Sequence, residues 1–121
     1  MKVHNFKDLK VWNLSVDLAT KAYKITQKFP ADERYGSTTQ AQRSAISIAS
    51  NIAEGCGRIG KGDFMRFVSI SMGSSYELET QITISFKLGY INEEELLELE
   101  TDIRPIQKML FKLYDSLETT K

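Results

Sequence analysis

The sequence of 121 residues contains one cysteine, one histidine, two prolines and no long apolar run. The lone Cys56 excludes an intrachain disulfide and a cysteine-based zinc site. The single histidine, His4, argues against a Ser-His-Asp or Cys-His catalytic system. No run approaches the roughly 20 apolar residues of a membrane span, and the first residues lack the apolar core of a signal peptide. We therefore expect a cytoplasmic protein with no membrane partner.

Signals for β-strands are missing as well, because no window alternates apolar and polar residues between turn signals. Pro30, Pro105 and the clustered glycines leave long stretches with helical periodicity. Short links between these stretches favour an antiparallel up-down-up-down four-helix bundle, an all-α fold. Pro105 predicts a kink, since proline removes one helical hydrogen bond. The expected single domain, residues 1–121, has helices at about 6–29, 39–55, 62–88 and 93–117.

An excess of charge of either sign is missing too, since 16 basic residues balance 16 acidic ones. The balance argues against a strong general nucleic-acid binder. The two halves differ, however: residues 1–66 carry 11 Lys/Arg and 6 Asp/Glu, whereas residues 67–121 carry 5 and 10. This asymmetry fits complementary solvated helix faces, and it also allows a locally basic face. Candidate nucleic-acid contacts are Arg58 and Lys61 in the glycine-rich link, and Lys21, Lys24 and Lys28 on the first helix.

Two helical runs, 40–58 and 66–80, are rich in small and polar residues where large apolar ones are usual. A glycine-rich link, G-C-G-R-I-G-K-G, separates them, so they are expected to form a tight antiparallel hairpin. The link resembles a phosphate-binding loop, but it lacks the preceding strand and the G-K-[ST] ending. A helix–helix turn therefore explains it better than a nucleotide site.

One antiparallel register brings opposite charges of this hairpin face to face. It places Arg43 against Glu77, and Glu54 against Arg66, while Ser47 faces a glycine of the second arm. Because buried charges need partners, we expect both ion pairs, with Asn51 bridging nearby. The alternative is that some of these groups are solvated. The predicted structural polar seam therefore comprises Arg43, Ser47, Asn51, Glu54, Arg66 and Glu77.

Carboxylates on the two central helices also invite comparison with di-metal bundles. Glu54, Glu77 and Glu79 are the candidates, but such sites use Glu-x-x-His pairs, and the sequence has none. We therefore expect no metal, no cofactor, no catalytic residue and no small-molecule substrate.

Four segments of the chain carry a family resemblance. They read F-K-D-L-K-V-W, K-F-P-A-D-E-R-Y-G, Q-A-Q-R-S-A-I-S-I-A-S-N-I-A-E-G-C-G-R and R-F-V-S-I-S-M-G-S-S-Y-E-L-E-T. Together they resemble the four-helix-bundle proteins encoded in intervening sequences of bacterial 23S rRNA genes, over about residues 6–117. The departures are small: Ala49 stands where the family often has proline, and Ser37 where it often has leucine.

The resemblance implies an antiparallel bundle that assembles into a ring-like homopentamer. It also implies a distant likeness to the accessory variability determinant of diversity-generating retroelements, which binds nucleic acid and reverse transcriptase. It supplies no catalytic residues. The first functional hypothesis is therefore a non-enzymatic oligomeric bundle that binds RNA or another nucleic acid. The alternative is a structural or protein-partner scaffold without nucleic-acid affinity.

Overall fold

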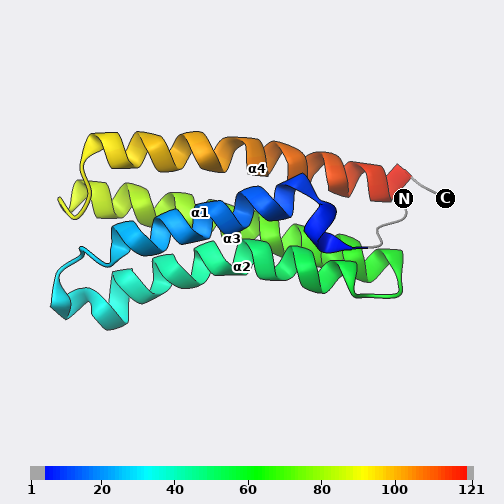
Figure 1. Ribbon diagram of the computed structural model, residues 1–121, viewed down its shortest axis with the longest axis horizontal. Coiled ribbons are helices and arrows are strands. Elements are labelled where there is room, and N and C mark those ends of the chain that lie inside the picture. Colours follow the sequence, from blue (N-terminus) through cyan, green and yellow to red (C-terminus); the bar gives the residue numbers. More distant parts are fainter. Residues whose placement is uncertain (1–4, 120–121) are drawn as a thin grey trace.

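The computed structural model describes residues 5–119, without the side chains of residues 34 and 35. Four helices lie side by side along the long axis of the molecule (Figure 1). They are α1 (Lys10–Thr26), α2 (Thr39–Cys56), α3 (Lys61–Lys87) and α4 (Glu93–Thr119). No strand occurs within the described residues. The predicted all-α four-helix bundle is confirmed.

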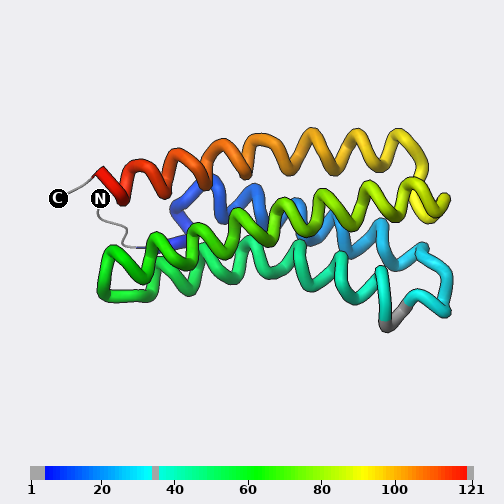
Figure 2. The backbone as a smooth tube through the Cα atoms, turned by 180° about the vertical axis from the view of Figure 1, so that it is seen from behind, coloured from blue at the N-terminus to red at the C-terminus, as the bar shows by residue number. Residues whose placement is uncertain are grey.

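Each helix packs against its neighbours in the order of the chain, and α1 also contacts α4. Two ion pairs show that α1 and α4 run in opposite directions. Lys21 pairs with Asp102, and Lys28, seven residues later, pairs with Glu95, which comes seven residues earlier. The α2–α3 turn lies at the same end of the bundle as the first and last described residues (Figures 1 and 2). The bundle is therefore the antiparallel up-down-up-down arrangement.

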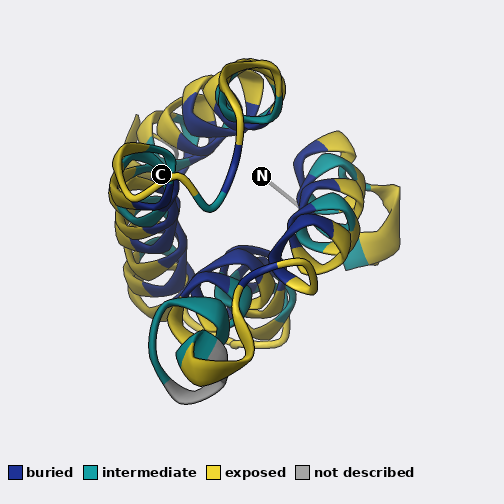
Figure 3. Cartoon of the chain, turned by 90° about the vertical axis from the view of Figure 1, so that its left-hand side faces the viewer, coloured by how far each residue is buried: buried dark blue, intermediate teal, exposed yellow. Residues whose placement is uncertain are grey.

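The core runs through the middle of the bundle, where the buried faces of all four helices converge (Figure 3). Its apolar residues recur at helical spacing along each element. Burial of this continuous apolar surface is what holds the helices together. The largest fully buried apolar side chains are Leu18, Ile48, Ile52, Val68, Leu78, Leu99, Ile103, Ile106, Leu110 and Leu117.

The first helix is shorter than its apolar periodicity indicates. Asn5 caps a 3-10 turn, Phe6–Asp8, and not α1, since its side chain accepts from the Lys7 amide. Leu9 is extended, with φ −79° and ψ 124°, so α1 begins only at Lys10. The Phe6 ring packs edge-on against Trp12, which folds this turn back onto the helix. The apolar periodicity continues across the extended Leu9 because Phe6 before it and Trp12 after it pack against each other.

The segment between α1 and α2 is irregular. A 3-10 turn, Ala31–Glu33, leads into a π-helical turn, Arg34–Thr38, in which Gly36 is far from helical values at ψ −109°. Thr38 occupies the N-cap position of α2, but its backbone is already helical and its side chain makes no capping bond. The Ser37 hydroxyl donates instead to the Glu33 carboxylate. Consequently α2 begins directly after a turn that is kinked at Gly36, without a side-chain cap.

The α3–α4 connection follows its local sequence signals closely. Gly89 has φ +82°, and its amide donates to the Phe86 carbonyl while the Tyr90 amide donates to Ser85. These two bonds form the Schellman ending for which glycine is favoured. The backbone amides of Asn92 and Glu95 then each donate to the other residue's side-chain oxygen, and this capping box starts α4. The helix α4 extends without interruption through Pro105, which lies exposed on its outer side.

Candidate functional site

A seam of serines joins α2 to α3. The Ser71 hydroxyl donates to the Ile48 carbonyl of α2 at 2.7 Å, and the hydroxyls of Ser47 and Ser74 lie 2.9 Å apart. Asn51 donates to both the carbonyl and the hydroxyl of Ser47. These bonds link hydroxyls directly to the facing helix, which requires the two backbones to approach closely. The seam is a structural feature, since its polar groups satisfy one another.

Gly55 marks the closest approach near the α2–α3 turn. A Cβ atom at this position would lie 2.9 Å from the ring of Phe64 and 2.9 Å from Phe67 Cβ. Gly55 is buried, so no solvent space is available on that side. A glycine is required here by the packing of Phe64 and Phe67, and not by an unusual backbone angle.

The predicted ion pairs across the hairpin are wrong, although the helices face each other nearly as expected. Glu54 pairs with Arg58 on its own chain segment at 2.7 Å, and Arg66 lies 3.8 Å from Asp63. The Glu77 carboxylate accepts from the Ser44 hydroxyl, and Arg43 is exposed, with no ion pair among the described residues. The register is set by small residues, so the long charged side chains turn outward. There Glu54 and Arg66 have partners three or four residues away in the sequence.

A second polar group inside the bundle escaped sequence analysis. Gln107 of α4 is buried, and its side-chain amide donates to the Ser75 hydroxyl and to the Glu79 carboxylate. Arg104 donates to Gln107 and pairs with Glu79, and these bonds lower the pKa of Glu79 below its ordinary value. The signal was present in the sequence, since Gln107 stands at helical spacing from Ile103 and Leu110 within the apolar stripe of α4.

Glu79 and Glu54 give a matched test of a partly buried against an exposed carboxylate. Glu54→Ala is expected to change the free energy of unfolding by no more than about 0.5 kcal/mol, because its carboxylate is 53% exposed and its partner is on the surface. Glu79→Ala is expected to cost about 1–2 kcal/mol, since it leaves the Gln107 amide short of an acceptor. Urea unfolding of the two variants measures the difference. A larger loss for Glu54→Ala would contradict this assignment.

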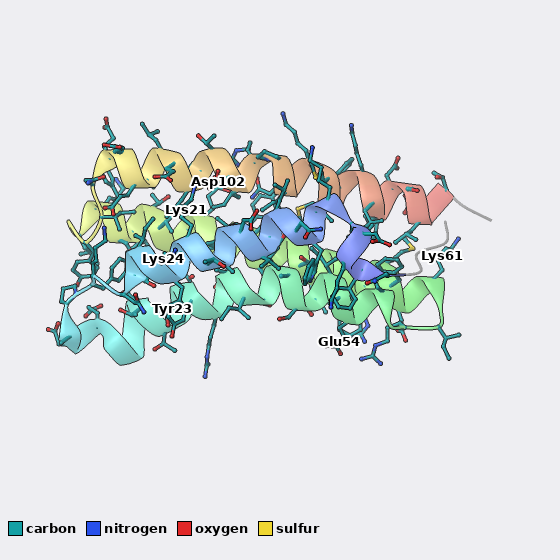
Figure 4. All side chains as sticks on the ribbon, in the orientation of Figure 1. Lys21, Tyr23, Lys24, Glu54, Lys61 and Asp102 are labelled. Carbon is teal, nitrogen blue, oxygen red and sulfur yellow. The ribbon has the colours of Figure 1, made fainter. Side chains whose placement is uncertain are left out.

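Most of the lysines and arginines predicted to contact nucleic acid are already engaged. Lys21 of α1 lies between Asp102 and Glu98 of α4, at 2.6 and 2.8 Å (Figure 4). Its hydrogen bond to Asp102 is the main reason that the pKa of Lys21 is raised. Lys28 pairs with Glu95, which lowers the pKa of that carboxyl. Lys21 of α1 and Lys28 just after it therefore hold this part of the chain against the acidic first half of α4.

The other predicted contact residues are dispersed over the molecule. Lys24 is exposed on α1, whereas Lys61 lies near the opposite end of the bundle (Figure 4). Arg58 is half exposed, with its guanidinium 4.7 Å above the Phe67 ring and bonded to Glu54. Arg66 covers the same ring at 4.8 Å. The structure thus does not bring the five predicted contacts together into one basic face.

The outer side of α3 is unusually apolar for a surface helix. Ile70, Tyr76 and Ile84 are 40%, 55% and 49% exposed, and Gly73 lies in open space between them. The exposed residues of this surface follow helical spacing and form one row. We call this surface, made of Ile70, Gly73, Tyr76, Glu77, Thr80 and Ile84, the outer face of α3. A helix with apolar side chains on several sides is usually packed against other protein surface on each of those sides.

A groove of about 650 Å³ lies between α3 and α4. Its apolar part comprises Met72, Tyr76, Pro105, Met109 and Phe111. Three cationic residues of α4, Arg104, Lys108 and Lys112, also line it. None of the predicted contact residues lies in this groove, which sequence analysis did not single out.

Two further features concern residues 5–119 only, namely metal-binding groups and membrane-spanning helices. Within residues 5–119, no group of three or more His, Cys, Asp or Glu side chains is placed to hold a metal ion. Cys56 is partly buried, and burial raises the pKa of its thiol. In the same part of the chain, no helix combines the length and apolar character needed to cross a bilayer. His4 lies outside the described residues.

Comparisons with known proteins agree on the fold. The family model of 23S rRNA-intervening sequence proteins matches residues 7–112. The chain is also similar to a crystal structure of a protein of unknown function from the S23 ribosomal protein family of Bacteroides thetaiotaomicron VPI-5482. That likeness has a TM-score of 0.77 at 23% identity, and it covers 86% of this chain and 97% of the other. A search of curated proteins finds no match.

Proposed function

Because the chain belongs to the family of 23S rRNA-intervening sequence proteins, we propose that it is a non-enzymatic bundle that acts as a homo-oligomeric scaffold. The outer face of α3 is the observation that carries this proposal. Three large apolar side chains stand exposed there around an open glycine, and Glu77 is the charged residue among them. A neighbouring copy that covered this face would remove that apolar surface from water. The ring of five copies is the assembly that the family resemblance implies.

A second, different surface favours head-to-tail contacts. Tyr23 and Ile46 are exposed beside a shallow groove between α1 and α2, lined also by Ala19 and Gln27. Because α1 packs against α2 and α4, it stands across the bundle from α3. Two unlike surfaces on different sides favour a contact in which one face of a copy meets the other face of the next. Such contacts close into rings when the rotation between copies permits it.

The scaffold accounts for the charged side chains better than RNA contact through Lys21, Lys28 and Arg58 does. Lys21, Lys28 and Arg58 each have a carboxylate partner, so that their positive charge is largely compensated. RNA binding through those residues would require breaking these pairs. The single histidine and single cysteine of the sequence support the non-enzymatic part of the proposal.

Light scattering on size-separated protein tests the proposal. The wild-type chain is expected to show five times the mass of one chain, whereas the double substitution Ile70→Lys/Ile84→Lys is expected to release single chains. Both side chains are part-exposed in the single chain, so the substitutions should leave its helical content unchanged. Ile59→Lys is the matched control, because Ile59 is fully exposed at the α2–α3 turn. A monomeric wild type, or an assembly that survives the double substitution, refutes the scaffold.

A further inference from the structure

The groove between α3 and α4 combines exposed aromatic rings with exposed cations. Phe111 is 69% exposed and Tyr76 55%, and they stand on the two helices that border the groove. Lys108 and Lys112 are exposed and have no ion pair within residues 5–119. They are four residues apart on α4, so they project on the same side of the helix, roughly 6 Å apart along its axis.

Arg104 extends the same cationic row by one turn. It is held by Glu79 and Gln107, so its position is fixed and its charge is partly compensated. No carboxylate lines the groove itself. Three of the five basic residues of the acidic half of the sequence therefore gather at this place. The net negative charge of residues 67–121 therefore conceals a group of positive charges at the groove.

We propose that the α3–α4 groove binds single-stranded nucleic acid, with bases stacked on Phe111 and Tyr76 and phosphates on Lys108 and Lys112. Aromatic platforms beside a cationic row are the combination that sequence-tolerant single-strand binding uses, because every base offers a π face and every nucleotide a negative charge. The apolar floor of Met72, Pro105 and Met109 supports the stacked bases. The groove adjoins the outer face of α3, with which it shares Tyr76, whereas Phe111, Lys108 and Lys112 lie outside that face. It does not use Lys21, Lys24 or Lys28.

Charge complementarity favours this occupant over a second copy of the chain. A copy that covered the groove would desolvate Lys108 and Lys112, and it would have to supply carboxylates at matching positions. Single-stranded nucleic acid supplies negative charge and flat apolar surfaces together. A duplex supplies only the charge, since its bases are stacked on one another and unavailable to Phe111.

Fluorescence anisotropy with a labelled oligouridylate tests the site on the full-length chain. We expect binding at low salt that weakens as salt rises. Phe111→Ser is expected to weaken binding by about 5- to 150-fold, the loss of one stacked base. Lys108→Glu/Lys112→Glu is expected to lower the slope of log affinity against log salt by about 1.4, since two phosphate contacts are lost. Circular dichroism checks that both variants keep the wild-type helical content.

The matched control is Lys10→Glu/Lys87→Glu, which makes the same change of charge at exposed positions outside the groove. It is expected to leave the salt slope unchanged. The proposal is overturned by absence of binding at low salt, or by an equal loss in this control. It is also overturned if uridine monophosphate competes as well as the oligonucleotide per phosphate, or if duplex RNA binds equally tightly. A change of oligomeric mass on Phe111→Ser would identify the groove as a contact between copies, and would refute the nucleic-acid site.

Discussion

Ser71→Leu is expected to lower the free energy of unfolding by about 1–3 kcal/mol, towards the upper end of that range. Ser71 is completely buried, and its hydroxyl reaches the backbone of the facing helix at Ile48. A leucine there needs space that only a separation of α2 and α3 can provide. The substitution also removes the hydrogen bond that joins the two helices. Urea unfolding at a fixed protein concentration measures the loss.

Ser69→Leu provides the control, because Ser69 stands two residues earlier on the same helix and is exposed. It is expected to change stability by no more than about 0.5 kcal/mol. Equal effects of the two leucines would show that the position on α3 does not matter, and that the close approach of α2 and α3 contributes little to the fold.

Gly55→Val is expected to cost a similar amount, about 1–3 kcal/mol, for a different reason. The first added carbon would already lie 2.9 Å from both Phe64 and Phe67, and the branched side chain adds two more. Relief requires moving the Phe67 backbone, since the contact is to its Cβ atom and not to the tip of a flexible side chain. Thermal unfolding followed by circular dichroism measures the effect as a lower Tm.

Gly62→Ala is the companion variant, and it is expected to have no effect or a stabilising one. Nothing lies within 4 Å of a Cβ atom at this position, which is in the first turn of α3. Alanine is favoured over glycine in a helix by up to about 1 kcal/mol. If Gly62→Ala proved as harmful as Gly55→Val, the requirement for glycine would lie in chain flexibility near the turn and not in packing against Phe64 and Phe67.

The sequence predicted which helices face each other more reliably than which side chains meet. The small residues of α2 and α3 indicated a close hairpin, and Ser47 with Ser74 forms one of its contacts. The same register gave the wrong ion pairs, because a helix register places backbones and not the ends of long side chains. Glu54 pairs with Arg58, four residues away on its own segment. That pairing costs less side-chain conformational entropy than a pairing with Arg66 across the hairpin would.

Short sequence motifs were sufficient to predict those helix ends that depend only on residues close together in the chain. The glycine at 89 and the Asn92–Glu95 pair determined how α3 ends and α4 begins, because their hydrogen bonds involve only neighbours in the chain. The start of α1 was not determined in this way. The extended Leu9 interrupts a pattern that is periodic on both sides, and only the packing of Phe6 on Trp12 accounts for the break.

By itself, the sequence determined the all-α fold, the number of helices and their antiparallel order, since these follow from periodicity, turn residues and short links. Only the tertiary structure decided the state of the charges. Lys21 belongs to an interhelical ion pair because α1 and α4, distant in sequence, lie side by side. Lys108 and Lys112 remain uncompensated beside Phe111 for the same kind of reason, since no acidic segment packs over that side of α4. Whether a charge is compensated depends on distances between different helices, and the spacing of residues along the sequence does not give those distances.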